Sequence, residues 1–404
     1  MTKLGLVVVV GALLVTGAEA KRPAPPPAPA PIDLAAVAER LVGVTANVKP
    51  NEIVMIEGPV EQAPLIEQLA IAVRKRGAHP LTSLMLSEAG HRQLYEVVPS
   101  KLDAQAPAAH LALAKVIDVK IVIDPGLDPA IAGSLPAERR ATMEKAWRTV
   151  IDANEKHDVR VVEIGNDFTP TAWRARMFGI SDGELYKMFW DGISADYSAI
   201  EINAAVMKAA LARGSELRIT HPNGTDFTVK IRGRKVLASD GVISDADIKA
   251  RGANVRSWLP AGEVYVTPVP GTAHGTIVDD HMLFEGKHVT GVTVTVAAGK
   301  ITAITANAGW DAAKPRYDAA GPRKNEIGVI DFGINPAVRG PANFESWVAA
   351  GTVTVTAGGN TWAGGSNKEP LVLDFKLRGA TATLDGQPLV EAGTVSSLSS
   401  LRAN

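Results

Sequence analysis

The sequence predicts an α/β protein, in which an N-terminal α/β domain with a mostly parallel sheet precedes a C-terminal β-rich α+β domain that carries the cleft. Short apolar runs alternate with helical patterns up to about residue 165. Alternating runs with Gly-rich turns fill the second half, and a helical stretch separates the two regions. The predicted boundaries are therefore 32–165 for the first domain, 166–213 for a helical connector and 214–404 for the second domain.

The first domain alternates between the two element types. Apolar side chains at helical spacing predict helices over 32–46 and 63–80, and the second helix closes at Gly77 behind a basic last turn. Strands are expected over the apolar runs 52–58, 81–86, 119–124 and 159–165. Strands that alternate with helices form parallel sheets. No P-loop or G-x-G-x-x-G pattern follows these runs, so nucleotide binding is not expected.

The second domain reads as a series of short strands. Two alternating runs in 215–233 meet at Pro222-Asn223-Gly224, which predicts a β-hairpin. The segment 289–306 repeats the pattern around Ala298-Gly299. The stretches GTVTVTAGG, LVLDFKL and TATLDGQPL predict further strands, so this half is largely β-structure.

The N-terminus has the three parts of a secretory signal peptide. A basic residue, Lys3, precedes an apolar run over 4–15, and small residues lead to a cleavage site after Ala20. We therefore expect residues 1–20 to be removed and the Pro/Ala-rich segment 21–31 to be an extended tether. The apolar run is shorter than the roughly 20 residues that span a bilayer. Export to a bacterial periplasm or secretion is predicted, with no membrane span after cleavage.

The composition excludes one class of partner and one kind of cross-link. The chain has 42 Lys and Arg against 43 Asp and Glu, without the basic excess typical of nucleic-acid-binding proteins. It has 0 cysteines, so no disulfide forms. The metallopeptidase pattern H-E-x-x-H and the hydrolase pattern G-x-S-x-G do not occur either.

Acidic residues on predicted strands are the remaining candidates for chemistry. Glu263 stands in LPAGEVYVTP where a strand begins, and Asp331 and Asp374 lie within apolar runs. Charged side chains on half-solvated strands usually face water. A carboxylate that points inward needs a partner or a bound cation, because an isolated buried charge is costly. Spacing alone leaves both orientations open.

The chain resembles the M29 metallopeptidases, the thermophilic aminopeptidase family of the leucyl aminopeptidase II type. The likeness runs from about Asp33 to Gly393 and rests on stretches such as VKPNEIVMIEG, RITHPNGTDFTVKIRGR, FGINP and GTVTVTAGGNTWAGGSN. The most specific stretch is LPAGEVYVTPV followed by GTI. The resemblance implies a two-domain aminopeptidase fold with a two-metal centre, and it suggests a homodimer.

The resemblance also implies a set of site residues. The family's LPAGEV glutamate is a metal ligand, which makes Glu263 the first candidate, and the aspartate of its H-x-D pair maps to Asp374. The second acidic ligand maps to Glu326 or Asp331, and the register of FGINP favours Asp331. Glu326 is then the candidate catalytic general base.

The chain departs from the family pattern at three ligand positions. Thr354 and Val372 stand where the family has histidines, and Thr361 or Trp362 stands near its tyrosine. Valine cannot coordinate a metal, and threonine does so poorly. A carboxylate-only site suits Mg, Mn or Ca better than Zn or Co, although the identity of the divalent ion, Mg, Mn, Co or Zn, stays open. Among nearby histidines, His274 is the first candidate for a substitute ligand.

We therefore expect an exported, metal-dependent aminopeptidase-like enzyme that removes N-terminal residues from peptide substrates. Two alternatives remain. The first is a family member that has lost catalysis and serves as a periplasmic peptide- or metal-binding protein, and the second is a structural or assembly role without a small-molecule site. Bound metal would separate the first two hypotheses from the third, and turnover would separate the enzyme from the binding protein.

Overall fold

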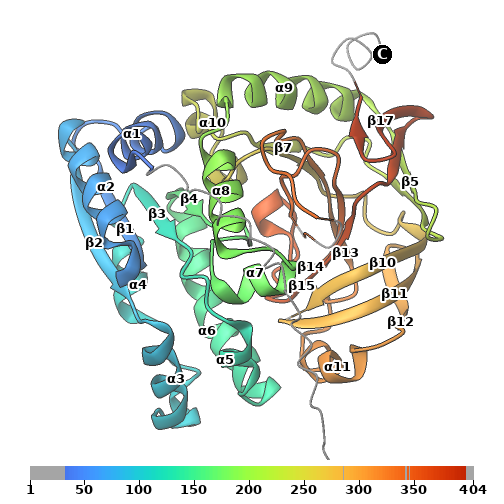
Figure 1. Ribbon diagram of the computed structural model, residues 1–404, viewed down its shortest axis with the longest axis horizontal. Helices are drawn as coiled ribbons and strands as arrows, with labels where there is room; N and C mark the ends of the chain where they lie inside the picture. The colour runs from blue at the N-terminus through green and yellow to red at the C-terminus, as the bar shows by residue number, and fades with distance from the viewer. Residues whose placement is uncertain (1–31, 285, 342–343, 345, 397–404) are drawn as a thin grey trace, which may run out of the picture. The chain divides into compact units, whose positions relative to one another are not determined.

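A five-stranded parallel sheet forms the framework of the N-terminal region, with the strand order β2-β1-β3-β4-β8. Strands β1 to β4 of this sheet are labelled in Figure 1. The computed structural model describes residues 32–284, 286–341, 344 and 346–396. Each neighbouring pair of strands runs parallel, so the predicted parallel sheet is confirmed. The strands of this sheet are β1 (Ile53–Pro59), β2 (His79–Met85), β3 (Val119–Ile123), β4 (Arg160–Ile164) and β8 (Arg256–Leu259).

Helices precede and follow these strands along the chain. Helix α2 packs on β1, β2 and α1, and it ends shortly before Gly77, whose φ of 75° reverses the chain. Side chains such as Ile56, Ile121 and Val162 are fully buried, because the central strands are covered by helices. The helices of this region are α1 (Leu34–Arg40) with a π-helical turn (Leu41–Thr45), α2 (Ala63–Lys75), α3 (Glu88–Val97), α4 (Ala108–Leu113), α5 (Pro129–Gly133) and α6 (Ala137–Lys156).

Three consecutive helices follow β4, as the sequence predicts for this stretch. They are α7 (Ala172–Phe178), α8 (Asp182–Ile193) and α9 (Tyr197–Arg213). Helix α8 begins at a capping box, in which Ser181 and Glu184 each bond to the backbone nitrogen of the other. Phe189 and Trp190 of this helix are buried, so its aromatic residues belong to the core.

Two antiparallel sheets make up the β-rich region. The eight-stranded sheet has the order β12-β11-β10-β6-β5-β16-β17-β18, and the five-stranded sheet has the order β15-β14-β13-β9-β7. The first contains β5 (Glu216–Thr220), β6 (Asp226–Lys230), β10 (His274–Phe284), β11 (Lys287–Ala297), β12 (Lys300–Thr305), β16 (Thr381–Leu384), β17 (Gln387–Glu391) and β18 (Thr394–Val395). The second contains β7 (Val236–Ser239), β9 (Glu263–Val266), β13 (Ile327–Gly333), β14 (Val353–Gly358) and β15 (Val372–Leu377).

Both hairpins expected from the sequence are present. Strands β5 and β6 pair around the Pro222-Asn223-Gly224 turn, and β11 and β12 pair around Ala298-Gly299. The shorter helices between strands are α10 (Asp245–Ala250), α11 (Trp310–Asp318) and the 3-10 turn η5 (Thr361–Ala363). Three further 3-10 turns lie at Val60–Gln62, Ser100–Leu102 and Gly252–Asn254.

The described residues, which lie between 32 and 396, belong to one compact unit. Strand β8 follows the hairpin of the β-rich region along the chain, yet it pairs with β4 and completes the parallel sheet.

The boundaries at 165 and 213 stay predictions, and the expected signal peptide and tether over 1–31 lie outside the described residues. None of the helices in the described part of the chain is long and apolar enough to cross a membrane.

Candidate functional site

The candidate site lies on one face of the five-stranded antiparallel sheet. Residues directly opposite each other in an antiparallel pair share a face, and strands β9, β13, β14 and β15 place four polar residues in one such row. Across the sheet these are Tyr265, Asp331, Thr354 and Lys376. Side chains two positions apart on a strand also share a face, so Glu263 and Asp374 lie on this face as well. The sheet thus brings three of the four acidic candidates to one surface.

Glu263 is held at the start of β9 by its turn and by a residue from the parallel sheet. Gly262 has a φ of 129°, and a Cβ there would lie 2.9 Å from the backbone nitrogen of Asn335. Asn166, which follows β4, donates hydrogen bonds from its Nδ2 to Glu263 Oε1 at 2.5 Å and to the Pro260 carbonyl at 2.9 Å. Burial raises the pKa of Glu263 to about 8, although the Asn166 hydrogen bond opposes that rise.

Asp331 is the most deeply buried carboxylate of the site. Its exposed fraction is 0%, and neither of its oxygens has a hydrogen-bond partner among the described residues. Burial raises the pKa of Asp331 well above its usual range, and the nearby charge of Glu263 raises it further. The hydroxyls of Tyr265, Thr354 and Thr356 also lack partners within the described part of the chain. The face therefore carries a cluster of buried polar groups.

A lysine supplies positive charge to this face. The ammonium of Lys376 pairs with the carboxylate of Asp374, two residues earlier on β15. The Lys376 side chain is only 6% exposed, and its Nζ lies 5.0 Å from the centre of the Trp347 ring. Its charge opposes the rise in the pKa of both Glu263 and Asp331. Asp374 is therefore occupied by an internal cation.

Glu326, the candidate general base, lies away from this cluster. It precedes β13 by one position and Asp331 by five, which corresponds to about 16 Å along an extended strand. Its carboxylate pairs with Arg323 at 2.7 Å and with Lys300 at 4.0 Å. The structure does not bring this side chain to Asp331.

His274 does not reach the cluster either. It lies on β10 of the eight-stranded sheet, where it pairs with Thr228, and its Nδ1 is 3.1 Å from the carbonyl oxygen of Thr272. Within the described residues, no group of three or more His, Cys, Asp and Glu side chains is arranged to hold a metal ion.

Aromatic rings connect the polar face of the sheet with the lining of a neighbouring cavity. The ring of Trp362 lies 5.3 Å from that of Tyr265, 5.5 Å from that of Trp258 and 6.1 Å from that of Trp347. The Trp347 indole donates to Asp167 at 2.6 Å. Trp362 thus contacts the site on one side and lines the cavity on the other.

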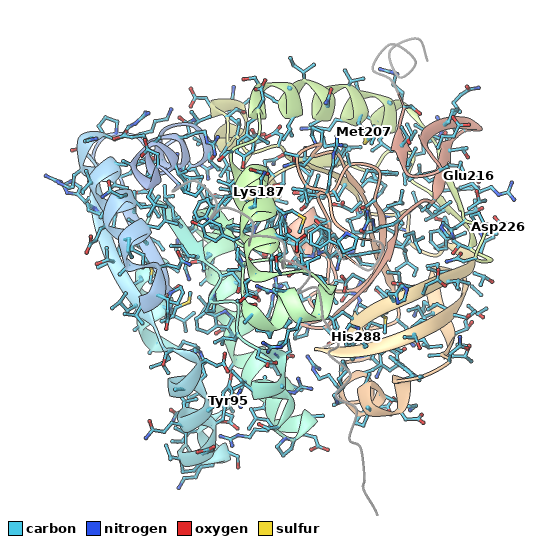
Figure 2. All side chains as sticks on the ribbon, viewed as in Figure 1. Tyr95, Lys187, Met207, Glu216, Asp226 and His288 are labelled. Carbon is cyan, nitrogen blue, oxygen red and sulfur yellow. The ribbon has the colours of Figure 1, made fainter. Side chains whose placement is uncertain are left out.

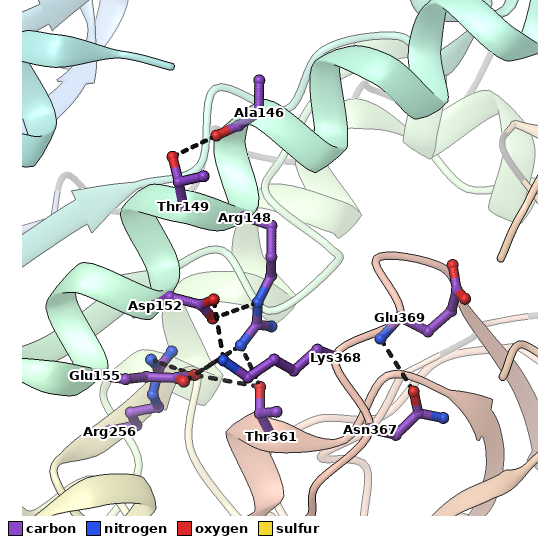
Figure 3. Close-up of polar contacts among 10 residues, drawn as sticks. All are labelled: Ala146, Arg148, Thr149, Asp152, Glu155, Arg256, Thr361, Asn367, Lys368 and Glu369. Carbon is purple, nitrogen blue, oxygen red and sulfur yellow. Dashed lines mark hydrogen bonds and ion pairs between the residues drawn. The ribbon is translucent and has the colours of Figure 1, made fainter. Parts of the chain in front are cut away.

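The cavity has a volume of about 570 Å³ and lies between helix α6 and the segment around η5. Apolar and aromatic residues, among them Trp147 and Tyr95, line it together with several charged residues. Tyr95 is labelled in Figure 2. Arg148 of α6 donates to Thr361 at 2.8 Å, and Lys368 pairs with Asp152 at 3.0 Å (Figure 3). A second cavity of about 710 Å³ adjoins it and shares Glu144, Arg148, Glu369 and Pro370.

Sequence reasoning missed the residues that neutralise and anchor the carboxylates. Lys376 had a readable signal, because it follows Asp374 by two positions in an alternating strand and so must share its face. Asn166 gave no such signal, since it bonds to Glu263 across 97 positions of sequence.

Residues 32–318 match the Peptidase M29 family, described as thermophilic metalloproteases. The chain belongs to this family. Among solved structures it is similar to wild-type AmpT from Thermus thermophilus, with 18% identity, a TM-score of 0.70, and coverage of 90% of this chain and 99% of AmpT. It also resembles 2,5-dihydroxypyridine dioxygenase from Pseudomonas putida, with 15% identity, a TM-score of 0.56, and coverage of 91% and 99%. These two similarities establish the fold alone. No curated protein sequence matches the chain.

Membership of the M29 family supports a metal-dependent, aminopeptidase-like hydrolase function with peptide substrates at the level of the family. The residues of this chain do not fit the two-metal centre that the resemblance implies. Thr354 and Val372 supply no imidazole, and the Asp374 carboxylate is taken by Lys376. Glu263 and Asp331 remain as a pair of buried carboxyl groups, which is too few donors for two ions.

Proposed function

We propose that this M29 protein binds peptides and does not hydrolyse them by two-metal catalysis. The observation that carries this proposal is the placement of Lys376, whose ammonium pairs with Asp374 on the face that also carries Glu263 and Asp331. A fixed ammonium neutralises the Asp374 carboxylate as a metal ion would, but it offers no open coordination position for water or a carbonyl oxygen.

The deep burial of the site residues supports the same proposal. Glu263 is 3% exposed, and Asp331 and Thr354 are 0% exposed. A peptide bond has to come within hydrogen-bond reach of a general base for hydrolysis. The cavity of about 570 Å³ is lined by Trp362, whose ring packs 5.3 Å from the Tyr265 ring, and none of the buried carboxylates lines it. The cavity has the size of ligand-binding pockets, so binding is possible where hydrolysis is not.

The alternative is the metal-dependent aminopeptidase with a carboxylate-rich centre formed by Glu263, Asp331 and Asp374. One observation favours it, because the two Asp331 oxygens are buried without a partner in the described part of the chain, and such a carboxylate is stabilised by a cation. That site would take a divalent ion with Glu263, Asp331 and Asp374 as its oxygen donors.

Metal content and turnover distinguish the two functions. The protein is purified without chelators, analysed for Mg, Mn, Co and Zn, and assayed with leucine and alanine arylamides in the presence of each ion. Peptide binding is measured by calorimetry on the same samples. We expect less than stoichiometric metal, no turnover above that of an Asp331→Asn variant, and measurable peptide binding. Glu391→Gln, an exposed substitution on β17, serves as the matched control.

Two results together would establish the aminopeptidase instead. The first is turnover, and the second is stoichiometric metal that is lost in Asp331→Asn but kept in Glu391→Gln. A protein with neither turnover nor peptide binding would leave the structural role as the remaining hypothesis.

A further inference from the structure

A cavity of about 370 Å³ lies at the edge of the parallel sheet where four of its strands end. Its lining residues belong to the segments that follow β1, β2, β3 and β4, and they include Glu61, Leu86, Asp124 and Thr169. None of the carboxylates of the candidate site lines it. Its volume is within the roughly 300–1,000 Å³ of ligand-binding pockets. The parallel sheet therefore carries a cavity of ligand size that is separate from the candidate site.

The strand order places this cavity at a reversal of the sheet topology. In the order β2-β1-β3-β4, the chain leaves β1 toward one edge and then returns past it to β3. Parallel crossovers are right-handed, so these two connections lie on opposite faces of the sheet. Leu69 of α2 accordingly shares a core with Ile56, whereas His110 of α4 contacts Glu57, whose side chain points to the other face. The carboxyl edge at such a reversal is where open α/β sheets bind their ligands.

Asp124 is a fixed polar group in the wall of this cavity. Its Oδ1 accepts a hydrogen bond from the Gly126 backbone nitrogen at 3.0 Å, and its Oδ2 accepts from Thr169 Oγ1 at 2.8 Å and from Arg174 Nη1 at 3.1 Å. Gly165 permits this arrangement, because its φ is 156° and a Cβ there would lie 2.4 Å from the Asp124 Cβ. The carboxylate is therefore held in place, and the guanidinium of Arg174 balances its charge.

Trp173 forms an aromatic wall of the same cavity. Its indole nitrogen donates to the Gly126 carbonyl oxygen at 2.7 Å, and the guanidinium carbon of Arg174 lies 4.9 Å from the centre of its ring. Leu86 and Leu127 add apolar surface, and Leu86 is 47% exposed. A fixed aromatic ring beside polar groups suits a ligand with an apolar face and a polar rim.

The remaining charges of the lining favour an uncharged ligand. Glu61, Asp128 and Arg176 line the cavity and form no ion pair within the described part of the chain, whereas Glu88 pairs with Arg92. An anionic ligand would meet the two carboxylates, and a polycation would meet the guanidinium. A neutral compound with several hydroxyl groups can donate hydrogen bonds to the carboxylates and accept them from the guanidinium.

We propose that this cavity binds a neutral saccharide, with one sugar ring packed against Trp173 and its hydroxyl groups bonded to Glu61, Asp128 and Arg176. A sugar ring combines an apolar C–H face with a rim of hydroxyl groups, which matches this lining. The inference goes beyond the proposed peptide binding and does not depend on it, because no candidate-site carboxylate lines the cavity.

Saturation-transfer NMR with the full mature chain detects binding, and calorimetry then measures the dissociation constant. The saccharide probes are glucose, N-acetylglucosamine, maltose and N,N′-diacetylchitobiose, and the charged comparison probes are phosphate, spermidine and leucine. We expect at least one saccharide to bind with a dissociation constant of about 1 mM or lower, without competition from a charged probe. If none of the four saccharides binds, or if a charged probe displaces the bound one, the inference is wrong.

Matched variants test whether the saccharide occupies this cavity. Ala172→Trp fills the cavity from the exposed start of α7 and should abolish saccharide binding, whereas Ala209→Trp, at an exposed position of α9, should leave it unchanged. Glu61→Gln should weaken binding by about tenfold, because a carboxylate accepts a stronger hydrogen bond than an amide does. Glu67→Gln, an exposed substitution on α2, is its control. Equal binding by the two tryptophan variants, whether retained or lost in both, would overturn the assignment to this cavity.

Discussion

Lys376 and Asp374 form an ion pair between neighbouring positions on one side of strand β15, and the Lys376 side chain is 6% exposed. Glu263 and Asp331 lie on the same face of the sheet, and the charge of Lys376 acts on the pKa of both. The lysine is therefore the internal counter-ion of Asp374, and its charge also acts on the two buried carboxyl groups of Glu263 and Asp331. This relationship has consequences for stability that do not depend on the function of the protein.

Replacement of Lys376 by methionine should destabilise the protein. The variant keeps the aliphatic part of the side chain but leaves Asp374 without its cation, and breaking a largely buried ion pair costs about 3 kcal/mol. Urea unfolding at pH 7 measures the free energy of unfolding. Lys187→Met is the control, because Lys187 of α8 (Figure 2) forms an ion pair with Asp191 in which both side chains are exposed, and such pairs contribute about 0.5 kcal/mol or less. Similar losses in both variants would contradict the counter-ion role.

Much of the fold could be predicted from the sequence because its signals are local. The parallel strands are short apolar runs between helical patterns, and the hairpin at Pro222-Asn223-Gly224 is set by its turn residues. Strand β10 was not expected, since its eleven residues include three charged or histidine positions in a row, Asp279, Asp280 and His281, and its strand conformation depends on pairing with β11. The placement of β8 in the parallel sheet likewise depends on contacts far apart in the chain.

The site was predictable in part. Alternation along strands is enough to place Asp374 and Lys376 on one face, and the LPAGEV turn indicates an unusual position for Glu263. The strand order decides which carboxylates meet, and that order brings Asp331 beside β9 while it leaves Glu326 at the end of β13. Tertiary pairing of this kind cannot be read from spacing within one segment.

Asp240 should make the protein less stable as the pH rises. Burial raises the pKa of this carboxyl from 3.8 to about 6 in the folded state. The unfolded chain therefore loses its proton first, and the free energy of unfolding falls between pH 3.8 and about 6 and stays low above it. Asp240→Asn keeps an acceptor for the Val242 backbone nitrogen and carries no charge. It should stabilise the protein by about 2 kcal/mol at pH 7.5 and have little effect at pH 4.

Urea unfolding at both pH values measures this difference. Asp318→Asn on α11 is the control, because its exposed side chain pairs only with Lys314 at the helix surface in the described structure. If Asp240→Asn stabilises the protein equally at pH 4 and pH 7.5, the effect is not the cost of ionising this partly buried carboxyl group.

The N-terminal sequence predicts that the mature chain begins at Lys21, because cleavage is expected after Ala20. Expression of the full-length gene in a Gram-negative host should place the protein in the periplasmic fraction. Intact mass measurement and N-terminal sequencing of that fraction check the cleavage position. A protein that keeps residues 1–20 and sediments with membranes would show that the segment is a retained anchor.

Gly262 positions Glu263, so an alanine at this position should be strongly destabilising. The backbone has a φ of 129°, and the added Cβ would lie 2.6 Å from the Asn335 Cβ and 2.9 Å from its backbone nitrogen. Strained backbone of this kind costs about 2 kcal/mol or more for a residue with a side chain. Gly183→Ala on helix α8 is the matched control, because a Cβ there meets nothing within 4 Å, and alanine favours the helix by about 0.5 kcal/mol or more. Thermal unfolding should therefore move in opposite directions for the two substitutions. If Gly262→Ala melts at the wild-type temperature, the turn does not need glycine, and the close approach to Asn335 does not fix the position of Glu263.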